Sequence, residues 1–149
     1  MREDGAMETT QPVTALSDHD SWNLISGVHL GRLVTVVEGR AEIFPVNFVI
    51  QRHTVLFRTA EGTKLFSAVM NDQVLFEADD HNVAEGWSVI VRGTATVLFG
   101  AAEIHDAEQA GLYPWIATQK LRYVRITPSD VTGRKFLFGP EPDSDSVPG

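Results

Sequence analysis

The segment from Phe57 to Phe66 constrains the fold of this chain most, because it joins a strand, a turn and a helix start. Arg58 ends a β-rich run, Gly62 supplies a turn, and Thr63 precedes an apolar helical pattern that begins at Leu65. Backbone N–H groups at a helix start attract anions. The segment therefore predicts a strand–turn–helix unit with the outline of an anion site.

Four side chains of this segment predict that the anion is a phosphate. The hydroxyls of Thr59 and Thr63 and the cations of Arg58 and Lys64 together complement a phosphate dianion. A second interpretation is that Thr63 only caps the helix and that Lys64 is a solvated side chain. The nucleotide-triphosphate loop Gly-x-x-x-x-Gly-Lys-Ser/Thr is absent, so a cradle of another kind is expected.

Composition excludes several classes of protein. The 149 residues suffice for one domain with a real core, and 43% of them are hydrophobic. The absence of cysteine excludes disulfides, thiolate nucleophiles and iron–sulfur clusters. A net charge of −8 argues against nucleic-acid binding, and no apolar run is long enough to span a membrane.

The ends of the chain differ in composition from its middle. Residues 1–15 are expected to be a flexible segment without an apolar export signal, so a cytoplasmic location is expected. Residues 16–138 are expected to form the folded domain. Residues 139–149, which are rich in Pro, Asp, Ser and Gly, are expected to be disordered.

Hydrophobic periodicity predicts six strands and three helices. Pro45 marks an edge, a bulge or an opening of its strand, and Asn47 points to the same side as Pro45. Residues 77–82 are expected to form an acidic loop, and residues 133–135 a basic turn. The predicted strands cover 31–37, 41–50, 54–59, 73–78, 86–99 and 121–131, and the predicted helices cover about 17–28, 63–70 and 101–112.

This set of elements is mainly β, with hairpin connections and short helices. A closed or partly open barrel removes the exposed edges of such a sheet. The sequence therefore predicts a six-stranded antiparallel barrel.

Five short segments, taken together and in their order along the chain, resemble those of a known family. Over residues 16–137 it resembles the pyridoxamine 5′-phosphate oxidase-like, FMN-binding split-barrel proteins, and above all small bacterial members of the flavin-nucleotide-binding or nitroimidazole-resistance-like kind. The segments are Gly31-Arg32-Leu33, Pro45-Val46-Asn47-Phe48, Phe57 to Leu65, Val74 to Asp79 and Gly86-Trp87-Ser88-Val89.

The resemblance implies a homodimer of split barrels with FMN in clefts between the protomers. It implies that Arg58, Thr59, Thr63 and Lys64 hold the FMN phosphate. It further implies a second set of residues along the flavin ring. These are Pro45, Val46 and Asn47 at its polar edge, and Trp87, Ser88 and Trp115 near the ring system.

The chain departs from the true oxidases at its C-terminal end. It carries only Gly133-Arg134-Lys135 before an acidic tail, where the oxidases have basic residues that grip the substrate phosphate. This departure argues against oxidation of pyridoxamine phosphate. Related branches bind a deazaflavin coenzyme or haem, and the deazaflavin stays open as an alternative to FMN.

Other candidate sites have weaker patterns. The five histidines lack metal-binding spacing, so no metal site is predicted, and Ser88 lacks the Gly-x-Ser-x-Gly setting of a hydrolase. The acidic group of Glu77, Asp79 and Asp80 is interpreted as solvated rather than catalytic.

The expected function is that of an FMN-dependent oxidoreductase. It would pass a hydride from a nicotinamide donor through FMN to a small acceptor, with no catalytic residue identifiable in the sequence. The alternatives are a deazaflavin-dependent reductase and a flavin carrier or sensor without turnover.

Overall fold

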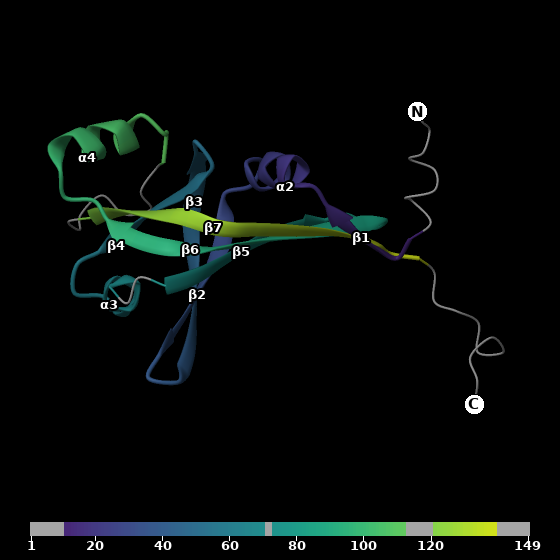
Figure 1. Cartoon of the computed structure of the whole chain (residues 1–149), viewed down its shortest axis with the longest axis horizontal. Coiled ribbons are helices and arrows are strands. Elements are labelled where there is room, and N and C mark those ends of the chain that lie inside the picture. Colours follow the sequence, from purple (N-terminus) through teal and green to yellow (C-terminus); the bar gives the residue numbers. More distant parts are fainter. Residues whose placement is uncertain (1–10, 71–72, 113–120, 140–149) are drawn as a thin grey trace.

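A computed structural model describes residues 11–70, 73–112 and 121–139. Within these residues the chain is mainly β, and none of the helices is long and apolar enough to cross a membrane. Figure 1 shows how the elements are arranged. In chain order they are β1 (Val13–Leu16), α2 (Asp18–Ile25), β2 (Leu30–Val37), β3 (Arg40–Gln51), β4 (Thr54–Ala60), α3 (Lys64–Val69), β5 (Gln73–His81), β6 (Glu85–Val97), α4 (Ala101–Glu108) and β7 (Leu121–Leu137).

Strands β2 to β7 close into a ring. The strand order is β1-β7-β4-β3-β2-β5-β6, and a further pairing of β6 with β7 joins the ends of the six-stranded set. Every pairing among the described strands is antiparallel. The prediction of a mainly β, six-stranded antiparallel split barrel with three short helices is thereby confirmed, and β1 is an additional strand on β7.

Strand β7 holds the ring together because it changes partner along its length. Its first part, from Leu121 to Ile126, pairs with β4. Its later part, from Gly133 to Phe136, pairs with β1, while β6 runs along the opposite edge of β7 from Val124 to Leu137. The barrel is therefore split, since β4 and β1 occupy successive stretches of one edge of β7.

Apolar side chains of alternating strand residues fill the interior of the ring. Phe48 and Phe76 meet edge to face, with ring centroids 4.7 Å apart. The largest fully buried side chains of this core include Phe48, Phe57, Phe76, Ile25, Leu33, Ile126, Val89, Val91 and Val124. A second apolar cluster joins the outer side of β4 and β7 to α4 through Leu56, Leu98, Ala107, Leu112 and Tyr123.

The side chain of Ser17 begins α2 as an N-cap. Its Oγ accepts a hydrogen bond from the backbone N–H of Asp20 at 3.1 Å, as the Ser–x–x–Asp pattern predicts. Trp22 and Ile25 then bury themselves in the barrel core. Trp22 also stacks on His53, with ring centroids 4.8 Å apart.

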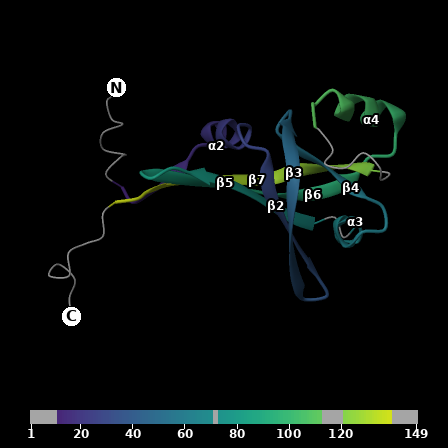
Figure 2. The same ribbon diagram turned by 180° about the vertical axis from the view of Figure 1, so that it is seen from behind.

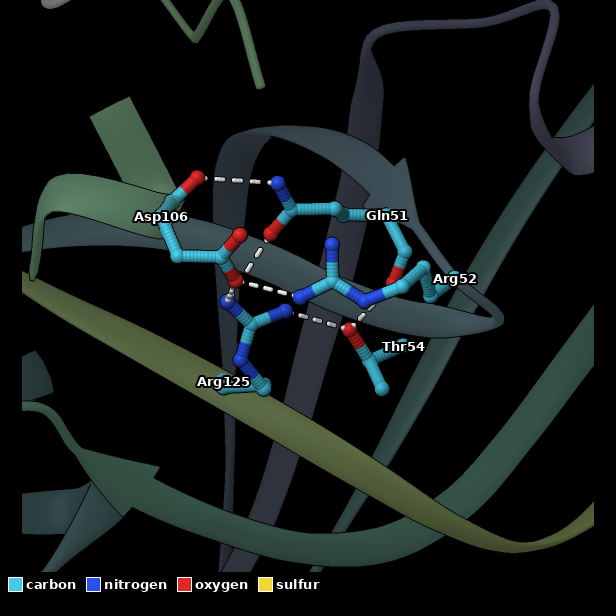
Figure 3. A network of polar contacts seen from close by, with 5 residues as sticks. All are labelled: Gln51, Arg52, Thr54, Asp106 and Arg125. Carbon is cyan, nitrogen blue, oxygen red and sulfur yellow. Dashed lines mark hydrogen bonds and ion pairs between the residues drawn. The ribbon is translucent and has the colours of Figure 1, made fainter. Parts of the chain in front are cut away.

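A polar network holds α4 against the β3–β4 turn and β7 (Figure 3). The Asp106 carboxylate accepts a hydrogen bond from Arg52, whose guanidinium lowers the pKa of Asp106. Arg125 of β7 donates to Gln51 Oε1 at 2.9 Å and to Thr54 Oγ1 at 2.7 Å. Gln51 Nε2 in turn donates to the Asp106 backbone carbonyl at 3.0 Å. The network fixes the helix over the second apolar cluster.

The structure differs from the sequence prediction at the N-terminal end. Residues 13–15, which the sequence places in a flexible segment, belong to β1 and pair with β7. The sequence does not reveal β1 because a strand of four residues is too short to show a clear alternation of apolar and polar residues. The helices are also shorter than predicted, since α2, α3 and α4 end at Ile25, Val69 and Glu108.

Two segments predicted as a loop and a turn are parts of strands. Strand β5 continues to His81, and the hairpin turn follows it, where Asn82 Oδ1 accepts from the backbone N–H groups of Ala84 and Glu85. Gly133 lies within β7, and a side chain at this position would collide with α2. A Cβ on Gly133 would come 2.3 Å from Ser21 Oγ. Glycine at this position allows α2 to pack closely on β7, and it does not form a turn.

Candidate functional site

Three of the predicted phosphate ligands meet where β4 leads into α3. Thr59 is buried at the end of β4, and its Oγ1 lies 3.2 Å from Thr63 Oγ1. Thr63 donates to the Ala60 carbonyl at 2.7 Å and accepts from the Phe66 N–H at 3.1 Å. Thr63 is therefore the N-cap of α3, as the second interpretation of this segment has it. Its capping bonds leave Lys64 as the most adaptable donor of the three.

Lys64 belongs to a charged cluster with two residues of β3 next to the turn of the β2–β3 hairpin. Lys64 Nζ lies 3.1 Å from Glu42 Oε1, and Arg40 Nε lies 3.2 Å from Glu42 Oε2. The Lys64 and Arg40 side chains are largely exposed, whereas that of Glu42 is mostly covered. Two cations thus share one carboxylate, which leaves a net positive charge in a protein whose overall charge is −8.

Arg58 lies on the opposite side of β4 from Thr59, as strand alternation requires. Its Nη2 donates to the Tyr123 hydroxyl at 2.5 Å, and its guanidinium lies 4.4 Å from the Tyr123 ring centroid. The buried Arg58 Nε has no hydrogen-bond partner among the described residues. The structure therefore does not bring Arg58 together with the threonine pair, and its role as a phosphate ligand stays a prediction.

The predicted ring-edge residues lie side by side on β3. Val46 is buried in the barrel core, whereas Pro45 and Asn47 point to the other side of the strand, opposite Arg32 and Leu30 of β2. Pairing of β3 with β4 begins only at Phe48, so Pro45 lies where β3 has β2 as its partner and no neighbour among the described strands on its other edge. This is the edge position that a proline without an N–H tolerates.

Trp87 and Ser88 point to opposite faces of β6. Trp87 is half-buried and packs against the barrel core. Ser88 points to the outer face and donates to Glu77 Oε2 at 2.9 Å. Of these two residues, only Ser88 shares a face with Pro45. The prediction for Trp115 falls outside the described residues.

The outer face carries an ion-pair cluster that the sequence prediction did not include in the site. Arg32 Nη2 donates to the two carboxylate oxygens of Asp79 at 3.0 and 3.2 Å, and Arg32 Nη1 lies 3.5 Å from Glu77 Oε1. In the strand registers Arg32 is opposite Pro45 on one side and opposite Glu77 on the other. Strands β2 and β3 cross the front of the molecule in Figure 2.

Burial raises the pKa of Glu77 from 4.5 to about 7, and a side-chain contact with Asp79 acts in the same direction. The hydrogen bond from Ser88 and the charge of Arg32 oppose this rise. A sequence signal for the cluster did exist, because Arg32, Glu77 and Asp79 all lie within the family-like segments. Their strands are far apart in sequence, so only the fold shows that they meet.

The strand order and the closure of β6 onto β7 place the described part of the chain in the class of antiparallel split barrels. The model of the pyridoxamine 5′-phosphate oxidase family matches residues 17–135, and the chain belongs to this family.

The chain is also similar to curated relatives and to solved structures. The uncharacterized protein Rv3129 of Mycobacterium tuberculosis is 62% identical over 95 residues, which cover 64% of this chain and 86% of that protein. The structure of the FAD binding protein from Mycobacterium smegmatis is 56% identical, with a TM-score of 0.80, covering 85% of this chain and 100% of that chain. A conserved protein of unknown function from Corynebacterium diphtheriae is 42% identical, with a TM-score of 0.76, covering 85% of this chain and 99% of that chain.

Proposed function

We propose that this protein binds a flavin and acts as a flavin-dependent oxidoreductase. The observation that carries the proposal is the hydroxyl pair of Thr59 and Thr63 beside the cation of Lys64, at the junction of β4 and α3. The 56% identical Mycobacterium smegmatis protein is described as FAD binding, which supports a flavin as the ligand.

The charged cluster around Lys64 suits a phosphate. Arg40 and Lys64 exceed the single carboxylate of Glu42 by one positive charge, and the Lys64 side chain is 68% exposed, so its ammonium can turn toward a ligand. The terminal phosphate monoester of FMN matches this donor set. We therefore propose FMN as the cofactor, with Thr59, Thr63 and Lys64 as phosphate ligands. Thr63 would exchange its hydrogen bond to the Ala60 carbonyl for one to the phosphate. We keep Arg58, whose side chain leaves the opposite side of β4 toward Tyr123, as a further candidate.

The outer face of β3 and β6 suits the ring of the flavin. Pro45 presents a flat apolar surface, Asn47 presents an amide, and Ser88 presents a hydroxyl on the same side of the sheet. We propose that these three side chains and the backbone of Val46 contact the ring, and we keep Trp87 and Trp115 as candidates for its vicinity.

A bound flavin supplies the acceptance and return of a hydride between a nicotinamide donor and a small acceptor. The residues of this chain bind and orient it: Lys64 and the threonines at the phosphate, and Pro45, Asn47 and Ser88 at the ring. This division of labour requires no protein nucleophile. A carrier or sensor has the same binding residues but no turnover, so reduction by NADPH or NADH distinguishes the two.

The first test is a visible spectrum after the purified protein is mixed with excess FMN and desalted. We expect retained flavin absorbance, and bleaching of that absorbance on addition of NADPH or NADH under anaerobic conditions. A protein that retains flavin but is not reduced by either donor contradicts the enzymatic part of the proposal. Parallel samples with FAD and with the deazaflavin coenzyme decide between the three cofactors. The protein should retain only its own cofactor in stoichiometric amount after desalting.

We further propose that a second copy covers the outer face of β2 and β3. Leu30, Val36 and Ile43 are apolar residues with 52%, 56% and 62% exposure, and the strand register places them on the face that carries Pro45. An apolar face of this kind is typical of a protein interface.

The test of the dimer is an Ile43→Glu variant. A carboxylate at this position would be desolvated between two copies, so we expect a dimer for the wild type and a shift to monomer for the variant. Light scattering coupled to size exclusion measures both masses. Val83→Glu is the matched control, because Val83 is 98% exposed at the β5–β6 turn. A monomeric wild type contradicts this part of the proposal.

A further inference from the structure

The Arg32 cluster on the outer face has more negative than positive side chains. One guanidinium serves two carboxylates, Glu77 and Asp79, and Asp79 receives both of the hydrogen bonds from Arg32 Nη2. Glu77 is left with the longer contact, 3.5 Å from Arg32 Nη1. When both acids are ionised the cluster therefore carries a net negative charge, and Glu77 is the acid that is held less firmly.

The surroundings of Glu77 come from three strands. Arg32 faces it from β2, Asp79 lies two residues along its own strand β5, and Ser88 donates to it from β6. The β6 residue directly opposite Glu77 is the apolar Ile90. Two further cations lie on this side, and both are exposed. Arg92 of β6 is two residues from Ile90 and lies 3.7 Å from Asp130, and Arg134 of β7 is opposite Ser88.

Glu77 also lies between two residues of the candidate ring contact. Pro45 is separated from it by Arg32 alone in the strand register, and Ser88 is its direct hydrogen-bond donor. We propose that Glu77 is the proton-exchanging group of the candidate flavin site, and that covering this face with the flavin ring draws a proton from solvent onto its carboxyl. This inference rests on the proposed function.

The physical reason is charge balance under an apolar cover. Desolvation disfavours a charged carboxylate, and a buried cluster is tolerated when its charges are paired. Protonation of Glu77 leaves Arg32 and Asp79 as a one-to-one ion pair, so the ring covers a neutral cluster. Because burial already raises the pKa of Glu77 to about 7, a modest further loss of hydration changes its protonation at physiological pH.

The first measurement is a carbon-13 NMR titration of the carboxyl of Glu77, assigned by its absence in Glu77→Gln. We expect a midpoint near 7 without flavin and a higher midpoint once FMN is loaded. The titration itself is carried out on the wild type, and Glu77→Asp provides the same assignment if Glu77→Gln folds less well. Retained FMN with an unmoved midpoint overturns this inference and leaves the proposed function intact.

The second measurement is the dissociation constant of FMN between pH 6.5 and 8.5. Linkage requires that affinity falls as pH rises, by up to about tenfold for each unit by which FMN raises the pKa of Glu77. We expect this slope in the wild type and its loss in Glu77→Gln. The ionisation of the FMN phosphate near pH 6 acts on every variant equally, so the comparison isolates Glu77.

Glu85→Gln is the matched control, because Glu85 also lies in the β5–β6 hairpin but pairs with Lys135, 3.4 Å away. We expect it to keep the wild-type slope. A Glu77→Gln variant with the wild-type slope overturns the inference. A wild type that retains no FMN, FAD or deazaflavin overturns the proposed function and this inference with it.

Discussion

Replacement of Lys64 by alanine is expected to weaken FMN binding by about 1–3 kcal/mol, the size of a lost charge-assisted hydrogen bond. This corresponds to a rise of roughly 5- to 150-fold in the dissociation constant. The exposed ammonium of Lys64 can turn toward a phosphate. The hydroxyl of Thr63, in contrast, already donates to the Ala60 carbonyl and accepts from the Phe66 N–H. Quenching of flavin fluorescence on binding measures the constant.

Glu42→Gln should have the opposite effect. It removes the carboxylate that lies 3.1 Å from Lys64 Nζ, so both the competition for the ammonium and the repulsion of the phosphate disappear. We expect tighter FMN binding in this variant. Lys135→Ala is the matched lysine control, since Lys135 lies on β7 beside Glu85, and its affinity should equal that of the wild type. Unchanged affinity in Lys64→Ala would show that the segment only caps a helix.

Replacement of Gly93 by alanine is expected to destabilise the fold by about 1–3 kcal/mol, the usual cost of forcing atoms into packed space. Gly93 lies at the register shift between β6 and β7. A Cβ there would come 2.2 Å from the Thr127 carbonyl oxygen and 2.9 Å from the Pro128 Cα. Both contacts are to backbone, which cannot rotate away as a flexible side chain can. Thermal unfolding followed by circular dichroism measures the loss.

Gly27→Ala provides the control for this substitution. A Cβ on Gly27 would lie 3.5 Å from the Leu24 carbonyl oxygen, an ordinary contact, so its melting temperature should stay close to that of the wild type. For a chain of this size each kcal/mol lowers the melting temperature by about 2–4 °C. Equal melting temperatures for the two variants would contradict the close packing of β6 on β7.

Most of the barrel could be predicted because alternation of apolar residues is a local signal. Strand β4 shows it directly, with Val55 and Phe57 in the core and Thr59 on the same side. The signal failed at β1, which is only four residues long, and at Gly133, whose role depends on Ser21 and Leu16 far earlier in the chain. Glycine can mark a turn or a close approach, and the sequence alone does not distinguish them.

The candidate site likewise contains residues that the sequence could predict and residues that it could not. Thr59, Thr63 and Lys64 are near neighbours in sequence, so a short motif brings them together. Arg58 shares that motif, but the alternation of the strand turns it toward Tyr123 instead. The partners Glu42 and Arg32 could not be assigned from sequence, because each meets its counterpart only when distant strands pair.

Strand β7 also sets the order in which the chain can become a closed barrel during synthesis. The hairpins β2–β3, β3–β4 and β5–β6 join neighbouring segments and can form as they emerge from the ribosome. The ring cannot close before β7 is made, because β7 alone among the described strands joins β4 to β6. Strand β7 also pairs with β1, for example Val13 with Phe136. Until β7 is made, the open edges of β4 and β6 are free to pair with other chains. The growing chain is therefore most exposed to aggregation just before its last described strand is made.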